Sequence, residues 1–102
     1  MQLEIPIGYE SLGAVLAKAI EQAALGKGKE RHATGEPFDK QPICAITRRV
    51  GYGYPLGQAE KKIEESQRLD TDSAIFELLG AINYLAAAVI CLEEYKNGGV
   101  KK

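Results

Sequence analysis

The feature that most constrains this chain is an uncharged run of 15 residues near its carboxyl end, Leu78–Leu92 (LLGAINYLAAAVICL). Acidic residues stand on both sides of this run, namely Asp70, Asp72 and Glu77 before it and Glu93 and Glu94 after it. A helix that is apolar on nearly every side must be surrounded by protein. The run therefore predicts the central helix of a bundle, or a helix at a contact between subunits.

Three more helices are predicted before this run. Residues 10–25 carry apolar side chains at the spacing of one helical face, which predicts an amphipathic helix. Pro42 suits the first turn of a second, short helix, because its missing N–H would have no intrahelical partner there. Pro55 can open a third helix, and Asp70 or Thr71 can cap the last one. We therefore predict an all-α fold, a small bundle of about four helices.

The whole chain, residues 1–102, is one domain in this prediction, with residues 1–8 as an extended arm and residues 97–102 as a frayed tail. We expect the first and last helices, which bring the most apolar area, to form the central pair. Asn83 is a polar residue in an apolar helix, a pattern that often fixes the register between packed helices. The last helix is apolar on nearly every side, whereas one partner helix covers an apolar stripe of only about 100°. We therefore expect a homo-oligomer that self-associates through the last helix.

Charge and cysteine content narrow the setting of the protein. The 13 basic and 14 acidic residues give a net charge of −1, which argues against a dedicated nucleic-acid binder. Cys44 and Cys91 lie among apolar neighbours, where we expect buried, reduced thiols. The N-terminus shows no secretion signal, and the apolar run of 15 residues is shorter than the roughly 20 needed to cross a bilayer. These features predict a cytoplasmic protein without a membrane span.

The first candidate site is the segment Gly51–Gly57 (GYGYPLG), which we interpret as a loop between two helices. Glycines let backbone N–H groups approach a ligand, and a tyrosine ring can stack on a base. With the neighbouring cations, the segment suits a phosphate-bearing small molecule. The predicted ligand-binding residues are Arg48, Arg49, Gly51, Tyr52, Gly53, Tyr54, Lys61 and Lys62. The alternative is a structural turn whose tyrosines cover the core.

Further cations, Arg31 and His32 among them, follow the first helix in the segment KGKERH. They belong to the predicted ligand site if the fold brings them beside Arg48 and Arg49. Positive charge at the carboxyl end of a helix also complements the helix dipole, so a solvated basic end is the alternative. A single histidine supports neither a catalytic dyad nor a metal site. We predict no catalytic residue, no metal and no cofactor.

The third candidate is acidic and comprises Glu60, Glu64 and Glu65 of the third helix with Glu77 of the last. Carboxylates from two neighbouring helices can hold Mg²⁺. The arrangement resembles the helical nucleoside triphosphate pyrophosphohydrolases of the MazG type, whose pattern is EExxE followed a helix later by ExxD. Arg68 and Gly80 stand where that family has two of its acidic residues. A divergent hydrolase is therefore one alternative function, and a solvated acidic face is the other interpretation of these residues.

Two segments, VGYGYPLGQAEKK (50–62) and ELLGAINYLAAAVICLE (77–93), resemble those of short helical accessory proteins of bacteriophages and prophages. The resemblance implies an accessory role, such as countering a host defence system. Some phage proteins of this kind are oligomeric traps for nucleotide signals, and others block a defence protein directly. We therefore predict a non-enzymatic binding protein for an anionic, nucleotide-like small molecule. A module that inhibits a host protein is the first alternative.

Overall fold

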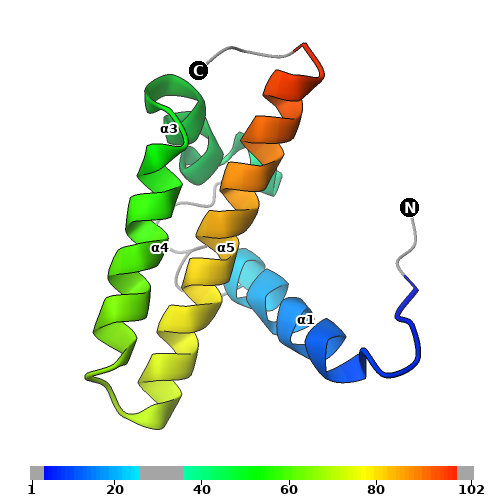
Figure 1. Ribbon diagram of the computed structural model, residues 1–102, viewed down its shortest axis with the longest axis vertical. Helices are drawn as coiled ribbons and strands as arrows, with labels where there is room; N and C mark the ends of the chain where they lie inside the picture. The colour runs from blue at the N-terminus through cyan, green and yellow to red at the C-terminus, as the bar shows by residue number, and fades with distance from the viewer. Residues whose placement is uncertain (1–3, 26–35, 99–102) are drawn as a thin grey trace.

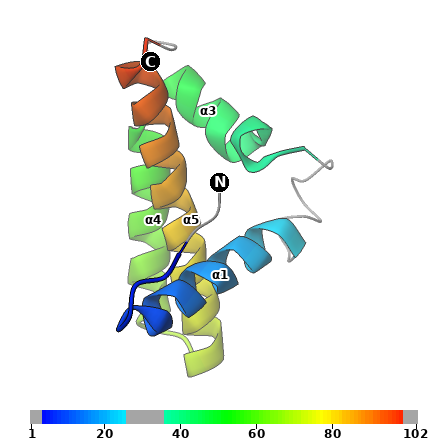
Figure 2. The ribbon, with the colours of Figure 1, turned by 90° about the vertical axis from the view of Figure 1, so that its right-hand side faces the viewer.

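The computed structural model describes residues 4–25 and 36–98, and these residues form helices and connecting turns without a β-strand. In chain order the elements are α1 (Glu10–Leu25), the short 3-10 helix η1 (Phe38–Lys40), α3 (Pro42–Val50), α4 (Gly53–Ser66) and α5 (Thr71–Lys96). Helices α4 and α5 run side by side as an antiparallel hairpin (Figure 1). Helices α1 and α3 project from the same side of this hairpin (Figure 2). The predicted all-α bundle of about four helices is confirmed.

Several predicted helix ends are confirmed by the backbone. The first helix spans Glu10–Leu25, as its apolar spacing indicates. Pro42 is the first residue of α3, where its missing N–H leaves no hydrogen bond unmade. Asp70 caps α5, because its Oδ2 accepts a hydrogen bond of 3.2 Å from the backbone N–H of Ser73. Residues 4–8 of the predicted arm are non-helical.

The predicted loop Gly51–Gly57 is wrong, because most of this segment belongs to α4. Only Gly51 and Tyr52 separate α3 from α4, which begins at Gly53. Gly51 makes this abrupt corner with a φ of 105°, and its N–H donates to the Thr47 carbonyl at 2.8 Å. Pro55 sits in the first turn of α4, where its fixed φ suits a helix and its missing N–H costs nothing.

The predicted pairing of the first and last helices as the centre of the core is also wrong. The most extensive packing joins α4 to α5. The short connection after Ser66 forces these two helices to lie antiparallel. Small residues on the facing side of α5, Gly80 and Ala87 among them, let α4 approach closely, and Ala87 is fully buried. The first helix meets α5 at an angle and buries only Ala19 completely.

Much apolar surface stays exposed in this arrangement. The buried apolar side chains of the described residues are small, namely those of Ala19, Cys44, Ala59, Ala81, Ala87 and Ala88. Larger side chains, among them Leu12 and Ile20 of α1 and Leu85 and Val89 of α5, are exposed. Among the described residues, a single copy of the chain therefore leaves many large apolar side chains exposed to water, which favours a further partner.

Helix α5 is also long and apolar enough to cross a membrane by length and composition alone. It has 26 residues, and its most apolar window has a mean hydropathy of 2.0. The whole helix therefore exceeds the roughly 20 residues needed to cross a bilayer, although its uncharged run of 15 residues does not. Core helices of proteins without membrane spans pass the same test.

Candidate functional site

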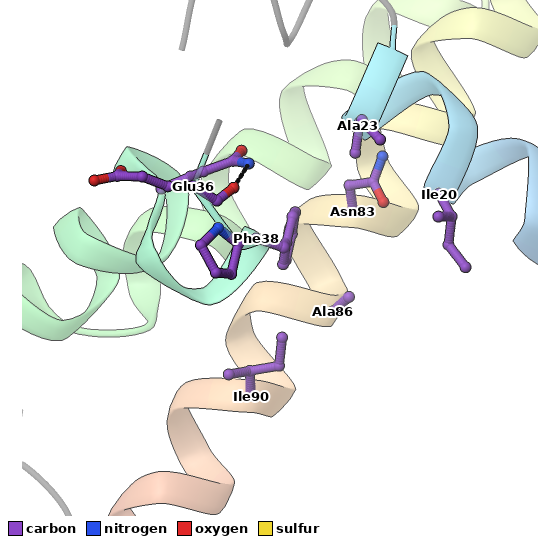
Figure 3. Close-up of a pocket in the computed structure, with 10 residues that line it drawn as sticks. Ile20, Ala23, Glu36, Phe38, Asn83, Ala86 and Ile90 are labelled. Carbon is purple, nitrogen blue, oxygen red and sulfur yellow. Dashed lines mark hydrogen bonds between the residues drawn. The ribbon is translucent and has the colours of Figure 1, made fainter. Parts of the chain in front are cut away.

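Two adjoining cavities lie where α1, η1 and α3 face the α4–α5 hairpin. The larger has a volume of about 610 Å³, and apolar side chains such as Ile20, Phe38, Ala86 and Ile90 dominate its lining (Figure 3). The smaller, of about 150 Å³, reaches inward and has a more polar lining that includes Tyr54, Lys62 and Tyr84. The two cavities share four lining residues, Ala23, Phe38, Gln41 and Asn83. Together they have the size of a site for a small molecule.

Three amide side chains of this lining are held by the backbone in one orientation. The Nε2 atom of Gln22 donates to the Phe76 carbonyl at 3.1 Å, and the Nδ2 atom of Asn83 donates to the Ala19 carbonyl at 3.0 Å. The Nε2 atom of Gln41 donates to the Glu36 carbonyl at 2.8 Å. Because a carbonyl only accepts, each amide must place its N–H₂ there and keep its oxygen free. The predicted interhelical contact of Asn83, from α5 to α1, is confirmed.

The free oxygens of these three amides are not fully buried. None of the three accepts a hydrogen bond from another described residue, and no buried side-chain nitrogen or oxygen among the described residues lacks a partner. Since these oxygens accept no hydrogen bond from a described residue, each of them keeps some exposed surface. The cavity lining therefore offers three fixed acceptors beside the ring of Phe38.

Lys62 brings the positive charge to the smaller cavity. Its Nζ lies 3.2 Å from Oε1 of Glu77 and 5.9 Å from the centre of the Tyr84 ring. Gly80 makes room for this side chain, because a Cβ atom there would lie 3.1 Å from the Cδ and Cε atoms of Lys62. The ammonium group has three N–H donors, and one of them donates to Glu77. Two donors therefore remain for a ligand.

Tyr54 and Tyr84 close the inner wall of the smaller cavity. Their rings meet edge to face, with centres 6.0 Å apart and planes at 79°. Burial, and then the neighbouring Tyr84 hydroxyl, raise the pKa of Tyr54 above its ordinary value of 10.0. The Tyr54 hydroxyl therefore stays protonated at neutral pH and can donate a hydrogen bond.

Arg48 is engaged elsewhere, in a fork that ties α3 to the end of α5. Its Nε and Nη2 atoms donate to the two carboxylate oxygens of Glu94 at 2.8 and 2.9 Å, and Nη2 also donates to the Asp39 carbonyl at 2.7 Å. The hydrogen-bonded carboxylate of Glu94 raises the pKa of the Arg48 guanidinium above its ordinary value. A ligand phosphate would have to compete with Glu94 for this cation.

The fork predicts a loss of stability in acid. The Arg48 guanidinium holds the pKa of Glu94 below its ordinary value of 4.5. A lowered carboxyl pKa contributes stability above the ordinary value, and the contribution disappears as the pH falls through the lowered one. We expect the free energy of unfolding to decline below pH 4.5, and to decline less steeply in Glu94→Gln. Urea titrations at several pH values measure both slopes, and equal slopes would contradict the assignment.

The structure does not bring the predicted cations to one place. The partners of Arg48 and Lys62 on α5, Glu94 and Glu77, lie 17 residues apart, or about 25 Å along the helix. Of the predicted ligand-binding residues, Tyr54 and Lys62 line the smaller cavity. Neither cavity is lined by Arg48, Arg49, Gly51, Tyr52, Gly53 or Lys61. Arg31 and His32 lie outside the described residues.

Three of the four acidic residues of the third candidate, all except Glu60, form separate ion pairs. Glu64 contacts Arg68 at 2.7 Å, Glu65 contacts Lys61 at 4.0 Å, and Glu77 contacts Lys62. Within residues 4–25 and 36–98, no three acidic, histidine or cysteine side chains converge as a metal site would require. The MazG-like pattern of the sequence is therefore not accompanied by a cluster of carboxylates in this part of the chain.

The two cysteines meet where α3 packs on α5. Cys44 is fully buried, and the Sγ of Cys91, which is half-buried, lies 3.8 Å from the Cys44 carbonyl. Both are free thiols. Burial is the main cause that raises the pKa of the Cys44 thiol to about 11. Both thiols are packing groups, and the predicted burial is confirmed for Cys44.

Sequence reasoning missed several residues of the cavity lining, namely Gln22, Phe38, Gln41 and, as a lining residue, Asn83. The only signal in the sequence was an amide on or beside an apolar helical face, which Gln22 and Asn83 share. The spacing of these four residues in the sequence does not show that the fold brings them together around the two cavities. Comparison with known proteins adds no further constraint, because no family model, no curated protein and no solved structure matches the chain.

Proposed function

We propose that this chain is a non-enzymatic, self-associating binding protein for a small, anionic, nucleotide-like ligand. The observation that supports it is the pair of cavities with three fixed amide acceptors, an aromatic ring and one cation in the lining. This proposal moves the predicted ligand site from the α3–α4 corner to the space between α1, η1 and the hairpin. Of the original residues it keeps Tyr54 and Lys62.

The larger cavity suits the base of such a ligand. A nucleobase presents exocyclic amines and ring N–H groups along its edge and a flat face above it. The oxygens of Gln41 and Asn83 can accept from the edge, and the ring of Phe38 can stack on the face. The apolar walls would exclude water from both contacts. A ligand without hydrogen-bond donors would leave the acceptors without partners, which disfavours it.

The smaller cavity suits the anionic part. Lys62 has two unspent N–H donors, and the protonated hydroxyl of Tyr54 lies in the same lining. A phosphate oxygen accepts strong hydrogen bonds from both kinds of donor. Gly80 would let the lysine stem lie flat against α5 while its head turns toward the ligand. Capture of a nucleotide signal needs no catalytic group, and this agrees with the accessory role that the phage resemblance implies.

We expect Lys62→Met to weaken nucleotide binding by at least about tenfold, because one charge-assisted contact is lost. The matched control is Lys61→Met, since Lys61 is the next residue on α4, is 67% exposed at its side chain and lines neither cavity. Isothermal titration with AMP, ATP and cyclic dinucleotides measures both variants. Lys62→Met combined with Glu77→Gln leaves no unpaired carboxylate and separates the loss of charge from local destabilisation.

Two results would contradict this proposal. One is equal affinity in Lys61→Met and Lys62→Met for a nucleotide that the unmodified chain binds. The other is no heat of binding with any nucleotide of the panel at millimolar concentration. The second result would favour the alternative function, a module that docks on another protein.

One observation favours that alternative. The corner between α3 and α4 exposes Val50 and Tyr52, with 59% and 46% of their surface in solvent, and Arg49 beside them is exposed. Aromatic and arginine side chains are enriched in protein interfaces. If the chain inhibits a host protein, we expect Tyr52→Ser to abolish that inhibition and to leave nucleotide binding unchanged.

A further inference from the structure

The exposed apolar side chains of α5 follow a seven-residue repeat. Apolar residues alternate at steps of three and four along 18 residues of the helix, in the order Ile75, Leu78, Ile82, Leu85, Val89 and Leu92. Written as a heptad, the first position holds Ile75, Ile82 and Val89, and the fourth holds Leu78, Leu85 and Leu92. Such a repeat keeps one continuous seam on one side of a helix. We call these six residues the α5 seam.

Most of the α5 seam is exposed in the part of one copy that the structure describes. Five of its six side chains are exposed, from 42% at Leu78 to 53% at Val89, and Ile82 is half-buried. The opposite heptad positions are those that attach α5 to its own chain. They hold Glu77 against Lys62, Tyr84 against Tyr54, and Glu94 against Arg48. One repeat therefore divides the helix into an attached face and a free face.

The residue types of the seam identify its partner. Isoleucine or valine at the first position with leucine at the fourth favours two parallel strands of a coiled coil. All six positions of the α5 seam obey this rule, and Glu77, the charged residue between Ile75 and Leu92, lies on the attached face. An identical helix is complementary to such a seam, because each layer then pairs like with like. We propose that the α5 seam pairs with the α5 seam of a second copy, parallel and in register.

The area of the seam is sufficient for such a pair. The exposed parts of the six side chains on two copies amount to on the order of 1,000 Å², the lower end of the size that a specific interface needs. The flanking positions hold mostly small residues: Ala74 and Ala86 are half-buried, and Ala81 and Ala88 are already buried within the chain. Two helices can therefore approach within the 8–10 Å that close packing requires. Helices α1 and α3 lie on one side of the hairpin (Figure 2) and do not cover the seam.

A second copy explains the apolar helix better than a lipid bilayer does. Helix α4 runs along α5, so a membrane around α5 would also meet the exposed charges of α4, Glu60, Lys61 and Glu64 among them. Charged side chains in the hydrocarbon region are costly. A protein seam needs only the free face of α5 and leaves α4 in water.

The first test is the mass of the assembly. We expect Val89→Glu to reduce the assembly to a single chain at concentrations where the unmodified protein is paired, as measured by light scattering after size exclusion. Val50→Glu is the matched control, because Val50 is 59% exposed against 53% for Val89 and lies outside the seam. A single-chain mass for the unmodified protein, or the same response in both variants, would overturn the proposal.

The second test is the direction of pairing. Leu78 meets Leu78 of the other copy in a parallel pair and Val89 in an antiparallel one. We expect Leu78→Cys alone to form a disulfide-linked dimer on mild oxidation. When Leu78→Cys and Val89→Cys are mixed, we expect little disulfide between the two variants, whereas antiparallel pairing would make that mixed dimer the main product. Glu60→Cys, exposed on α4, controls for chance collisions, and the unmodified chain controls for Cys44 and Cys91. A Leu78–Val89 link as the main product would overturn parallel pairing.

A third arm separates protein from lipid. Flotation with phosphatidylcholine vesicles should leave the unmodified protein in the aqueous fraction, and partition into the vesicles would overturn pairing as the reason for the seam. The inference rests on the self-association part of the proposed function and not on the ligand. If Val89→Glu stays paired while the protein binds nucleotide, the seam alone is overturned. If Lys62→Met binds nucleotide as well as Lys61→Met does while the dimer is intact, the ligand site alone is overturned.

Discussion

Replacing Gly51 by alanine should lower the free energy of unfolding by about 2 kcal/mol, because the backbone there adopts a conformation that side chains oppose. The φ of Gly51 is 105° with a ψ of 161°, a combination accessible in practice only to glycine. Gly51 follows the last residue of α3, and α4 begins two positions later. The connection is therefore too short for neighbouring residues to relieve a strained φ at position 51. Urea unfolding followed by circular dichroism measures the loss.

Gly53→Ala is the matched control, two residues along the chain. A Cβ atom there meets nothing within 4 Å, and Gly53 is the first residue of α4 with no positive φ. Alanine should be neutral or stabilise by up to about 1 kcal/mol, since it restricts the unfolded chain. Equal losses for both variants would show that the corner of Gly51 is not the cause.

Arg48→Met should cost about 2 kcal/mol of stability, because three hydrogen bonds of one charged group are lost together. The fork reaches both oxygens of Glu94 and the Asp39 carbonyl, so its loss loosens η1 and α3 from α5 at once. Partial exposure of both side chains, 25% for Arg48 and 34% for Glu94, screens the charges and limits the cost. Thermal and urea unfolding measure it.

Arg49 supplies the control, because it is the next residue of α3, is exposed and makes no ion pair with another described residue. Arg49→Met should change stability by less than about 0.5 kcal/mol. A double-mutant cycle of Arg48→Met with Glu94→Gln isolates the coupling between the two side chains. If Arg48→Met weakened nucleotide binding without a loss of stability, Arg48 would be a ligand residue and not a structural tie.

The helices that carry their own signals could be predicted from the sequence. The apolar spacing of residues 10–25, the proline at position 42 and the cap at Asp70 are local features, and each sets a helix end by itself. The segment Gly51–Gly57 misled the prediction because three glycines and a proline in seven residues are typical of a loop. Tertiary packing against α5 overrides that preference, and Pro55 is tolerated in a first turn.

Which two helices form the core pair depends on the length of the connection between them and on the size of the residues that face each other, and composition reports neither. Apolar area favoured the first helix as the partner of α5, but the short turn after Ser66 and the small residues of α5 favour α4. The seam of α5 was hidden for a related reason. Every face of that helix is rich in apolar residues, and the heptad becomes visible once Glu77, Tyr84 and Glu94 show which face is attached.

The candidate site was located only in part. Tyr54 and Lys62 line the smaller cavity, but the sequence grouped them with Arg48, whose partner Glu94 lies near the other end of α5. Charges close in the sequence are not close in space when a helix carries them apart. Phe38 and Gln41 gave no sequence signal, because their place in the lining depends on how η1 and the start of α3 face α5 across the cavity.

Native mass spectrometry of the protein purified from cells tests the central claim most directly, because one spectrum gives the assembly size and any retained ligand. We expect even multiples of the 11.1 kDa chain, with a nucleotide-sized molecule bound after incubation with pooled nucleotides and cyclic dinucleotides. A paired chain that retains none of them would contradict the ligand site, and a single chain of 11.1 kDa without any adduct would contradict the whole account.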